Sequence, residues 1–155
     1  MNNAYKFTET QTDSFVVSPA SYPNSTLAIQ DLPLIDNCVD ARLSVGEVAR
    51  LFDRHPEWPG VILTTNNQFI GLLTRRVCAE FLGTFLATGF FSKISILDFF
   101  ENHPACGQVL DGGTSVSEAV RLALKRQGPA VFDPIVVRLS RTHYSLLDIP
   151  ALLNA

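Results

Sequence analysis

The residues best suited to ligand chemistry form one short run, Thr74-Arg75-Arg76, which follows an apolar segment and opens a segment typical of a helix. The first N–H groups of a helix have no partner within the helix and carry a partial positive charge. Two guanidinium groups at such a helix start could bind a phosphate bidentately. The alternative is that both arginines are solvated on an exposed first turn, and the sequence leaves both interpretations open.

The other residue types that perform catalysis are scattered. The three histidines are far apart, and two of them precede a proline, a context typical of loops: His55, His103 and His143. No Ser, His and Asp occur in the order and context of a known nucleophile motif. The sequence therefore predicts a protein that is not an enzyme.

Three cysteines, Cys38, Cys78 and Cys106, are also widely spaced. An odd number at such spacing is a poor disulfide framework, and no Cys-x-x-Cys or Cys/His cluster is present to hold zinc. Free thiols are typical of a reducing compartment. We therefore expect no metal site, no required cofactor and a cytoplasmic protein.

The composition narrows the class of protein further. The chain has 155 residues, of which 46% are hydrophobic and 17% charged, so it can bury a substantial core. Its net charge of −3 argues against a nucleic-acid partner, because phosphate backbones need clustered Lys and Arg. No stretch is apolar enough to span a membrane, and the first 15 residues do not resemble a secretory signal.

The segments around these candidate residues contain a repeat. The segment VDARLSVGEVARLF, residues 39–52, matches LDGGTSVSEAVRLA, residues 110–123, at six of 14 positions with an offset of 71. In both copies Ser-x-x-Glu, at Ser44 and Glu47 and at Ser115 and Glu118, predicts a helix that begins with a capping box. Apolar residues then recur on one helical face in both copies. Repetition at a fixed spacing indicates a duplicated structural unit.

The segments around these helices repeat as well. VILTT, NNQ and FIGLL predict a hairpin in the first copy, as do PIVVRLS, RTH and YSLL in the second. A helix should follow each hairpin, and the one in the second copy, DIPALLNA, is cut short. Similar short segments, here called lead-ins, precede the first helix of the two copies: Ile29-x-Asp31 and Ile96-x-Asp98. Each copy thus reads as β-α-β-β-α, and since one such unit buries too little to be stable, we expect an α+β fold with two units packed sheet to sheet.

This order of elements, occurring twice, resembles a tandem CBS-domain pair, the Bateman module. The resemblance is carried by LSVGEVARLF and GVILTTNNQFIGLLTRRV in the first copy and by TSVSEAVRLALK and IVVRLS…YSLLDIPALL in the second. It implies two repeats related by a pseudo-twofold axis: residues 27–90 and 91–155, the latter with a truncated final helix. Residues 1–26, poor in apolar pattern, are expected to form a flexible tail.

The resemblance also implies a function. Such pairs form homodimers, bind AMP, ATP or another adenosyl ligand in clefts between the repeats, and regulate an attached output domain. In bacterial signalling proteins the output is often of diguanylate cyclase or kinase type. We therefore expect a regulatory nucleotide-sensing module, with neither nucleic acid nor membrane as partner. A degenerate pair that serves only for dimerisation and binds no ligand is the alternative.

The ligand pattern of the family maps only partly onto the chain. Many members carry G-h-h-T-x-x-D after the second hairpin strand, where h is apolar and the Asp holds the ribose hydroxyls. The first copy has the Gly and Thr but Val77 at the Asp position, whereas the second has only Asp148, two positions early. The resemblance places the cleft residues at Val39, Asp40, Thr74, Arg75, Arg76 and Asp148.

Overall fold

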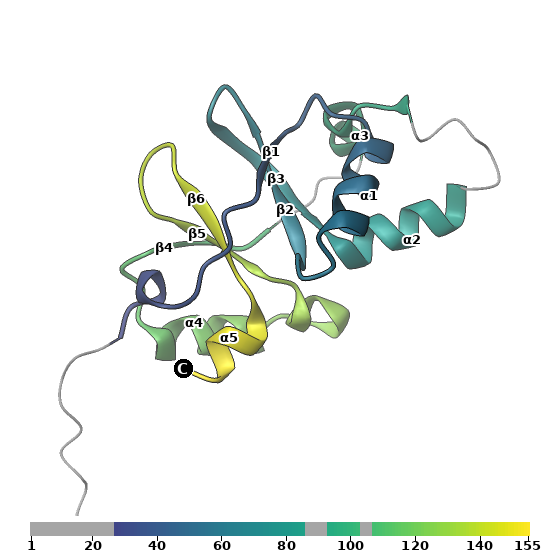
Figure 1. Cartoon of the computed structure of the whole chain (residues 1–155). Coiled ribbons are helices and arrows are strands. Elements are labelled where there is room, and N and C mark those ends of the chain that lie inside the picture. The colour runs from purple at the N-terminus through teal and green to yellow at the C-terminus, as the bar shows by residue number, and fades with distance from the viewer. Residues whose placement is uncertain (1–26, 86–92, 103–106) are drawn as a thin grey trace, which may run out of the picture.

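Two three-stranded sheets, each accompanied by helices, make up the fold of this chain in a computed structural model that describes residues 27–85, 93–102 and 107–155 (Figure 1). In the first repeat the elements are β1 (Cys38–Asp40), α1 (Val45–Arg54), β2 (Gly60–Thr65), β3 (Gln68–Thr74) and α2 (Arg75–Phe85). In the second they are β4 (Val109–Asp111), α4 (Val116–Leu124), β5 (Ile135–Arg138), β6 (Tyr144–Leu147) and α5 (Ile149–Leu153). The predicted β-α-β-β-α order is therefore confirmed twice.

Both sheets have the same topology. The first strand of each repeat runs parallel to the second, and the second pairs antiparallel with the third, in the orders β1-β2-β3 and β4-β5-β6. The turn between β2 and β3 contains Asn66 and Asn67, which have positive φ values of 51° and 60°. Asparagine tolerates this left-handed conformation better than most residues, so this pair favours a tight hairpin turn.

The two repeated helices begin as predicted, but only one completes its capping box. Ser44 accepts from the N–H of Glu47, and the Glu47 carboxylate accepts from the N–H of Ser44 at 2.8 Å. Ser115 likewise accepts from the N–H of Glu118. The predicted second half of that box is wrong, because the Glu118 carboxylate forms an ion pair with Arg121 instead.

The lead-in segments cross from one repeat to the other. Ile29, in the short 3-10 helix η1 (Ile29–Asp31), donates its N–H to the carbonyl of Thr114 in the second repeat at 2.9 Å. Ile96, at the start of α3 (Ile96–Asn102), donates to the carbonyl of Leu43 in the first repeat at 2.9 Å. Both isoleucine side chains have no exposed surface, and each belongs to the core of the opposite repeat. The two repeats therefore exchange their lead-ins reciprocally.

Further backbone bonds confirm the symmetry of this exchange. Gln30 donates to Gly112 at 3.0 Å, and Leu97 donates to Ala41 at 3.0 Å. Each acceptor in the second repeat lies 71 residues beyond its counterpart in the first, which is the offset of the sequence repeat. The predicted boundaries, 27–90 and 91–155, remain predictions, and the predicted tail at 1–26 lies outside the described residues.

The sheets face each other across a small apolar core. Ile62 and Leu72 of the first sheet pack with Val136 and Leu146 of the second, and all four are buried. On its other face each sheet packs against its helices: Figure 1 shows α1, α2 and α3 beside the first sheet and α4 and α5 beside the second. The predicted sheet-to-sheet packing is thus confirmed.

The sheet register locates an insertion in the second repeat. Cys38 pairs with Ile62, and Val109 pairs with Val136, so the offset grows from 71 in the first strands to 74 in the second. The extra residues belong to the loop that contains the 3-10 helix η3 (Gly128–Phe132). By the same register Asp148 is the counterpart of Thr74, because Leu146 and Leu72 face Val136 and Ile62.

Candidate functional site

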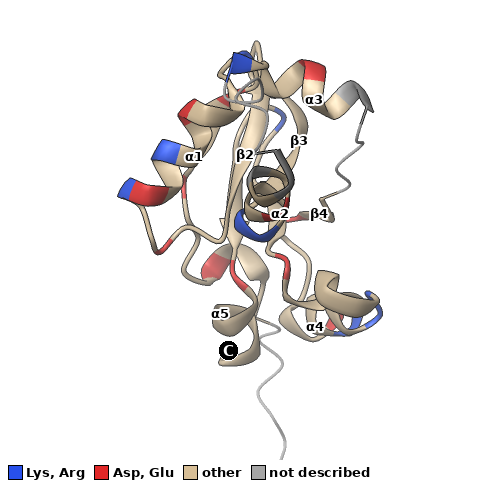
Figure 2. Ribbon diagram, turned by 90° about the vertical axis from the view of Figure 1, so that its right-hand side faces the viewer, with Lys and Arg blue, Asp and Glu red and all other residues tan. Residues whose placement is uncertain are grey.

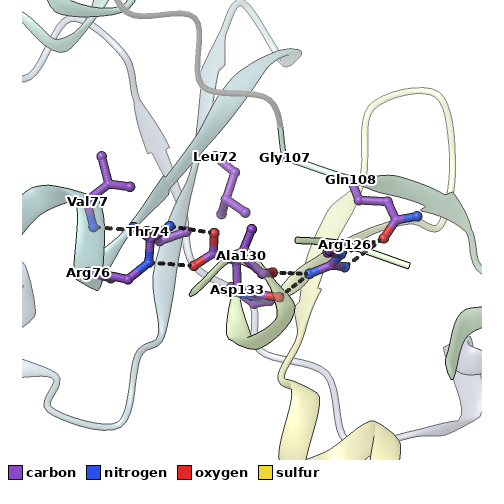
Figure 3. Close-up of a pocket in the computed structure, with 10 residues that line it drawn as sticks. Leu72, Thr74, Arg76, Val77, Gly107, Gln108, Arg126, Ala130 and Asp133 are labelled. Carbon is purple, nitrogen blue, oxygen red and sulfur yellow. Dashed lines mark hydrogen bonds and ion pairs between the residues drawn. The ribbon is translucent and has the colours of Figure 1, made fainter. Parts of the chain in front are cut away.

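A cavity of about 520 Å³ lies at the seam between the repeats. Its wall from the first repeat is formed by the end of β3 and the start of α2: Leu72, Thr74, Arg76 and Val77. Its wall from the second repeat is formed by the approach to β4 and the loop before β5: Gly107, Gln108, Arg126, Ala130, Asp133 and Pro134. The site therefore requires both repeats, as Figure 3 shows.

An ion pair connects the two walls. Arg76 donates to both oxygens of Asp133, from Nη2 at 2.9 Å and from Nε at 3.3 Å. Its Nη1 also donates to Glu80, one turn along α2, at 3.0 Å. Asp133 and Glu80 both raise the pKa of Arg76. Since the Arg76 side chain remains 37% exposed and that of Asp133 20%, the pair is partly screened by solvent.

A second guanidinium, that of Arg126, lies on the second-repeat wall and binds neutral acceptors. Nε and Nη2 donate to Oε1 of Gln108 at 2.9 and 2.7 Å. Nη1 donates to the backbone carbonyls of Ala130 and Asp133. Burial lowers the pKa of Arg126, and the nearby Asp133 carboxylate opposes that shift. Arg126 thus holds the loop before β5 while it keeps a half-buried positive charge beside the cavity.

The remaining lining combines an apolar surface with one hydroxyl. The buried Thr74 places Oγ1 3.1 Å from the N–H of Val77, which it caps as α2 begins. Leu72 lies close to Gly107, where an added Cβ would come within 2.6 Å of the leucine Cβ. A residue without a side chain is therefore required for this close approach of the second repeat to β3.

Arg75, predicted beside Arg76 as a phosphate ligand, points away from this cavity. Its guanidinium donates to the carbonyls of Phe52, His55 and Trp58, at 3.0, 2.6 and 3.0 Å. Its Cζ also lies 4.8 Å from the centre of the Phe52 ring, a cation–π contact. Arg75 therefore anchors the loop between α1 and β2, and of the two adjacent arginines Arg76 lines the cavity.

The other predicted site residues are spread over the molecule. Asp40 lies at the far end of β1, opposite Thr64, where its ion pair with Arg42 lowers its pKa to about 2. Val39 packs against the core of the first repeat. Asp148 caps α5, where it accepts from the N–H of Ile149 at 2.9 Å. The structure thus brings Thr74 and Arg76 together at the cavity, and the other four predicted residues lie elsewhere.

Sequence reasoning missed the second-repeat wall: Gln108, Arg126 and Asp133. Two signals pointed to it. The loop before the second strand is longer in the second copy than in the first, and inserted loop residues often carry specific functions. In the aligned copies Gln108 also stands where the first copy has Asn37, directly before the first strand. The backbone carbonyl of Asn37 accepts from the N–H of Ile62 in β2, and that of Gln108 accepts from the N–H of Val136 in β5.

Metal binding and membrane insertion find no support in the described part of the chain. No three His, Cys, Asp or Glu side chains among residues 27–85, 93–102 and 107–155 lie close enough together to hold a metal ion. None of the helices described is both long enough and apolar enough to cross a bilayer.

Solved structures share this fold at low sequence identity. A putative acetoin utilization protein (AcuB) from Vibrio cholerae aligns with a TM-score of 0.64 and 9% identity, over 83% of this chain and 89% of that one. CBSX2, solved in complex with AMP, aligns with a TM-score of 0.60 and 14% identity, over 82% of this chain and 93% of that one.

Hypoxic Response Protein I, solved with two coordinated zinc ions, aligns with a TM-score of 0.61 and 14% identity, over 83% of this chain and 98% of that one. No protein-family model matches the sequence, and no curated protein matches it significantly. The likeness is therefore one of fold: the chain has the architecture of a tandem CBS-domain pair.

Proposed function

We propose, from the tandem CBS-pair architecture, that this chain is a non-catalytic regulatory module that binds a small molecule between its repeats. The observation that carries the proposal is the cavity, whose two walls come from different repeats and are joined by the Arg76–Asp133 ion pair. A ligand in this position contacts both repeats. Its binding therefore favours whichever angle between them gives the better contacts, which is a shift of population by differential binding.

An adenine nucleotide is the first ligand to test. CBSX2, which shares the fold, was solved with AMP, and a cavity of about 520 Å³ falls within the range of small-molecule sites. The acidic net charge of −3 argues against nucleic acid as the partner. The proposal includes a cytoplasmic location and an output domain, attached or separate, to which the bound state is passed.

A homodimer is part of the same proposal. Large apolar side chains are exposed on the helices and the long loop of the second repeat: Leu124 (63%), Phe132 (77%) and Leu153 (56%). Figure 2 shows α5 almost free of charged residues, whereas α1 carries both signs along its outer side. Apolar surface of this kind favours a protein–protein contact. Light scattering should give twice the monomer mass of 17.0 kDa.

Thermal unfolding with and without ligand tests the sensor. AMP, ATP, S-adenosylmethionine and cyclic dinucleotides are each added at millimolar concentration to the full chain. A ligand at 100 times its Kd stabilises the folded state by about 2.7 kcal/mol, which raises the melting temperature by several degrees. An unchanged melting temperature with every compound would contradict the proposal.

A second candidate function is a scaffold that only dimerises. It is favoured by Val77, which stands where the family pattern has a ribose-binding Asp, and by Asp133, which already neutralises Arg76. A dimer whose melting temperature responds to none of these compounds would support the scaffold over the sensor.

A further inference from the structure

The charges that line the cavity do not balance. Two of the lining residues are cationic, Arg76 and Arg126, and one is anionic, Asp133. The Asp133 carboxylate bonds Arg76 with both of its oxygens. Arg126 bonds only the backbone carbonyl of Asp133, and the Asp133 carboxylate acts on it through space. The ten lining residues therefore carry a net charge of +1, and Glu80, which does not line the cavity, also bonds Arg76.

The position of Arg126 makes that charge significant. Its hydrogen bonds run to one side-chain amide and two backbone carbonyls, all of them neutral acceptors. A guanidinium withdrawn from water gains more from an anionic acceptor than from a neutral one. Because Arg126 lines the cavity itself, an anion that enters can supply this missing interaction.

Asp133 already occupies the place of such an anion. It belongs to the loop that is longer in the second repeat than in the first, and it binds Arg76 in the two-pronged geometry that guanidinium groups form with carboxylates and phosphates. Figure 3 shows Arg76 and Arg126 pointing toward Asp133 from opposite sides. Asp133 takes two nitrogen donors of Arg76 and Glu80 takes the third, so a ligand anion that binds Arg76 from the cavity competes with Asp133.

We propose that the recognised part of the ligand is a phosphate-type anion, which exchanges with Asp133 for Arg76 and adds an ionic partner for Arg126. The inference rests on the proposed function and names the chemistry of its ligand. Asp133 acts as a built-in competitor that lowers affinity. Exchange also breaks the Arg76–Asp133 pair that joins the two walls, so that anion binding and the linkage between the repeats exclude each other.

Calorimetric titration with pyrophosphate, AMP and the uncharged nucleoside adenosine tests the proposal. The proteins compared are the native chain, Asp133→Asn, Arg76→Gln and the control Asp111→Asn. The control removes the same charge from the second repeat, at the exposed pair between Asp111 and Arg138. Circular dichroism melting verifies that each variant is folded.

Pyrophosphate and AMP should bind, and adenosine should bind at least about tenfold more weakly than AMP. Asp133→Asn should tighten pyrophosphate binding about five- to tenfold, Arg76→Gln should weaken it about tenfold, and Asp111→Asn should leave it nearly unchanged. Added salt should weaken binding of the anions.

Three outcomes would overturn the inference: no pyrophosphate binding to Asp133→Asn at millimolar concentration, equal tightening by Asp111→Asn, or binding that Arg76→Gln leaves unchanged. Adenosine binding as tightly as AMP would also overturn it. That last result would leave the proposed sensor function intact, because a ligand would still occupy the chain.

Discussion

Both repeats hold the loop between their helix and their second strand with a guanidinium group, but the arginine comes from a different element in each. In the first repeat Arg75 reaches back from α2 to the carbonyl of Phe52 in α1 and to those of His55 and Trp58 in the loop. In the second repeat the counterpart of Arg75 is Ile149, and Arg126, at the start of the loop, bonds the loop carbonyls instead.

This difference accounts for the charge of the cavity. Loop carbonyls withdrawn from water need donors in both repeats, and arginine supplies several at once. Arg75 does so inside the first repeat, against Phe52, whereas Arg126 does so on the surface that faces the neighbouring repeat. Because different arginines bond the corresponding loops, only the second repeat places its loop-binding arginine, Arg126, beside the cavity. The backbone of the two repeats is therefore symmetric, but the lining of the cavity is not.

The largest expected effects test whether the repeats depend equally on each other. Ile29→Ala and Ile96→Ala each remove a fully buried side chain that packs in the opposite repeat. Each variant should lower the free energy of unfolding by about 2–5 kcal/mol, because each leaves a cavity in a core. Urea denaturation measures this, with Ile70→Ala as control, because this isoleucine is 38% exposed and should cost less than about 1 kcal/mol. A small effect of either isoleucine variant would contradict the exchange of lead-ins.

The next test compares how much Arg75 and Arg126 each contribute to the free energy of unfolding. Arg75→Met should destabilise the fold by about 2–4 kcal/mol, because three carbonyls lose a charged donor and Phe52 loses its cation. Arg126→Met should cost less, about 1–2 kcal/mol, since removing an unpaired half-buried charge offsets part of the loss. Arg50→Met, on the exposed side of α1, is the matched control. Equal losses for Arg75→Met and Arg126→Met would show that the two loops are held in energetically equivalent ways.

The helix starts provide a smaller contrast. Ser44→Ala should lower the free energy of unfolding by about 1 kcal/mol, and Ser115→Ala by less, because only the first helix has a complete box. Bonds from Ser44 hold the pKa of Glu47 below its usual 4.5, and Arg121 does the same for Glu118. A lowered carboxylate pKa gives stability that is present above pH 4.5 and is lost as the pH falls through the folded-state value.

Unfolding between pH 3 and 6 separates these two causes. Glu47→Gln should reduce the loss of stability on acidification that Glu47 causes, whereas Arg121→Gln should reduce the loss that Glu118 causes. An unaltered pH profile in Glu47→Gln would show that the carboxylate half of the box is not formed in solution.

The smallest effect concerns one buried thiol. Burial raises the pKa of Cys78 to about 11, and its counterpart by register is the buried Leu152. At pH 8 Cys78 should resist iodoacetamide and Cys38 should react faster than Cys78, because Cys38 is exposed, although burial also raises the pKa of its thiol. Peptide mapping by mass spectrometry locates the label. Rapid labelling of Cys78 in the folded protein would show that α2 opens readily.

Local patterns predicted the elements and their order well. Ser-x-x-Glu, the Asn-Asn turn and the apolar alternation are each encoded within a few residues, so both β-α-β-β-α units could be located. The sequence alignment of the two hairpins was wrong by one residue. The sequence shows that the second copy contains an insertion, but it does not show at which residue the two copies align again. Asp148 was therefore matched one position away from its counterpart Thr74.

The site was predicted only in part because its formation depends on direction and distance. Arg75 and Arg76 are adjacent, so a helix turns their side chains about 100° apart, and only the loops packed around α2 decide which one meets the seam. Asp133 and Arg76 are 57 residues apart and meet only because the sheets pack face to face. The lead-ins were recognised as equivalent, but no local pattern shows in which core each one lies.

The exchange of lead-ins sets an order of events during synthesis. The first sheet lacks Ile96 until translation has passed the start of α3, and Ile29 has no core to enter until β4, α4 and the second hairpin have been made. The first core can therefore close once residues 96–100 have emerged, whereas Ile29 stays unpacked until the second hairpin has been made. Synthesis of the second repeat, more than emergence of the first sheet, is thus what commits this molecule to its native form.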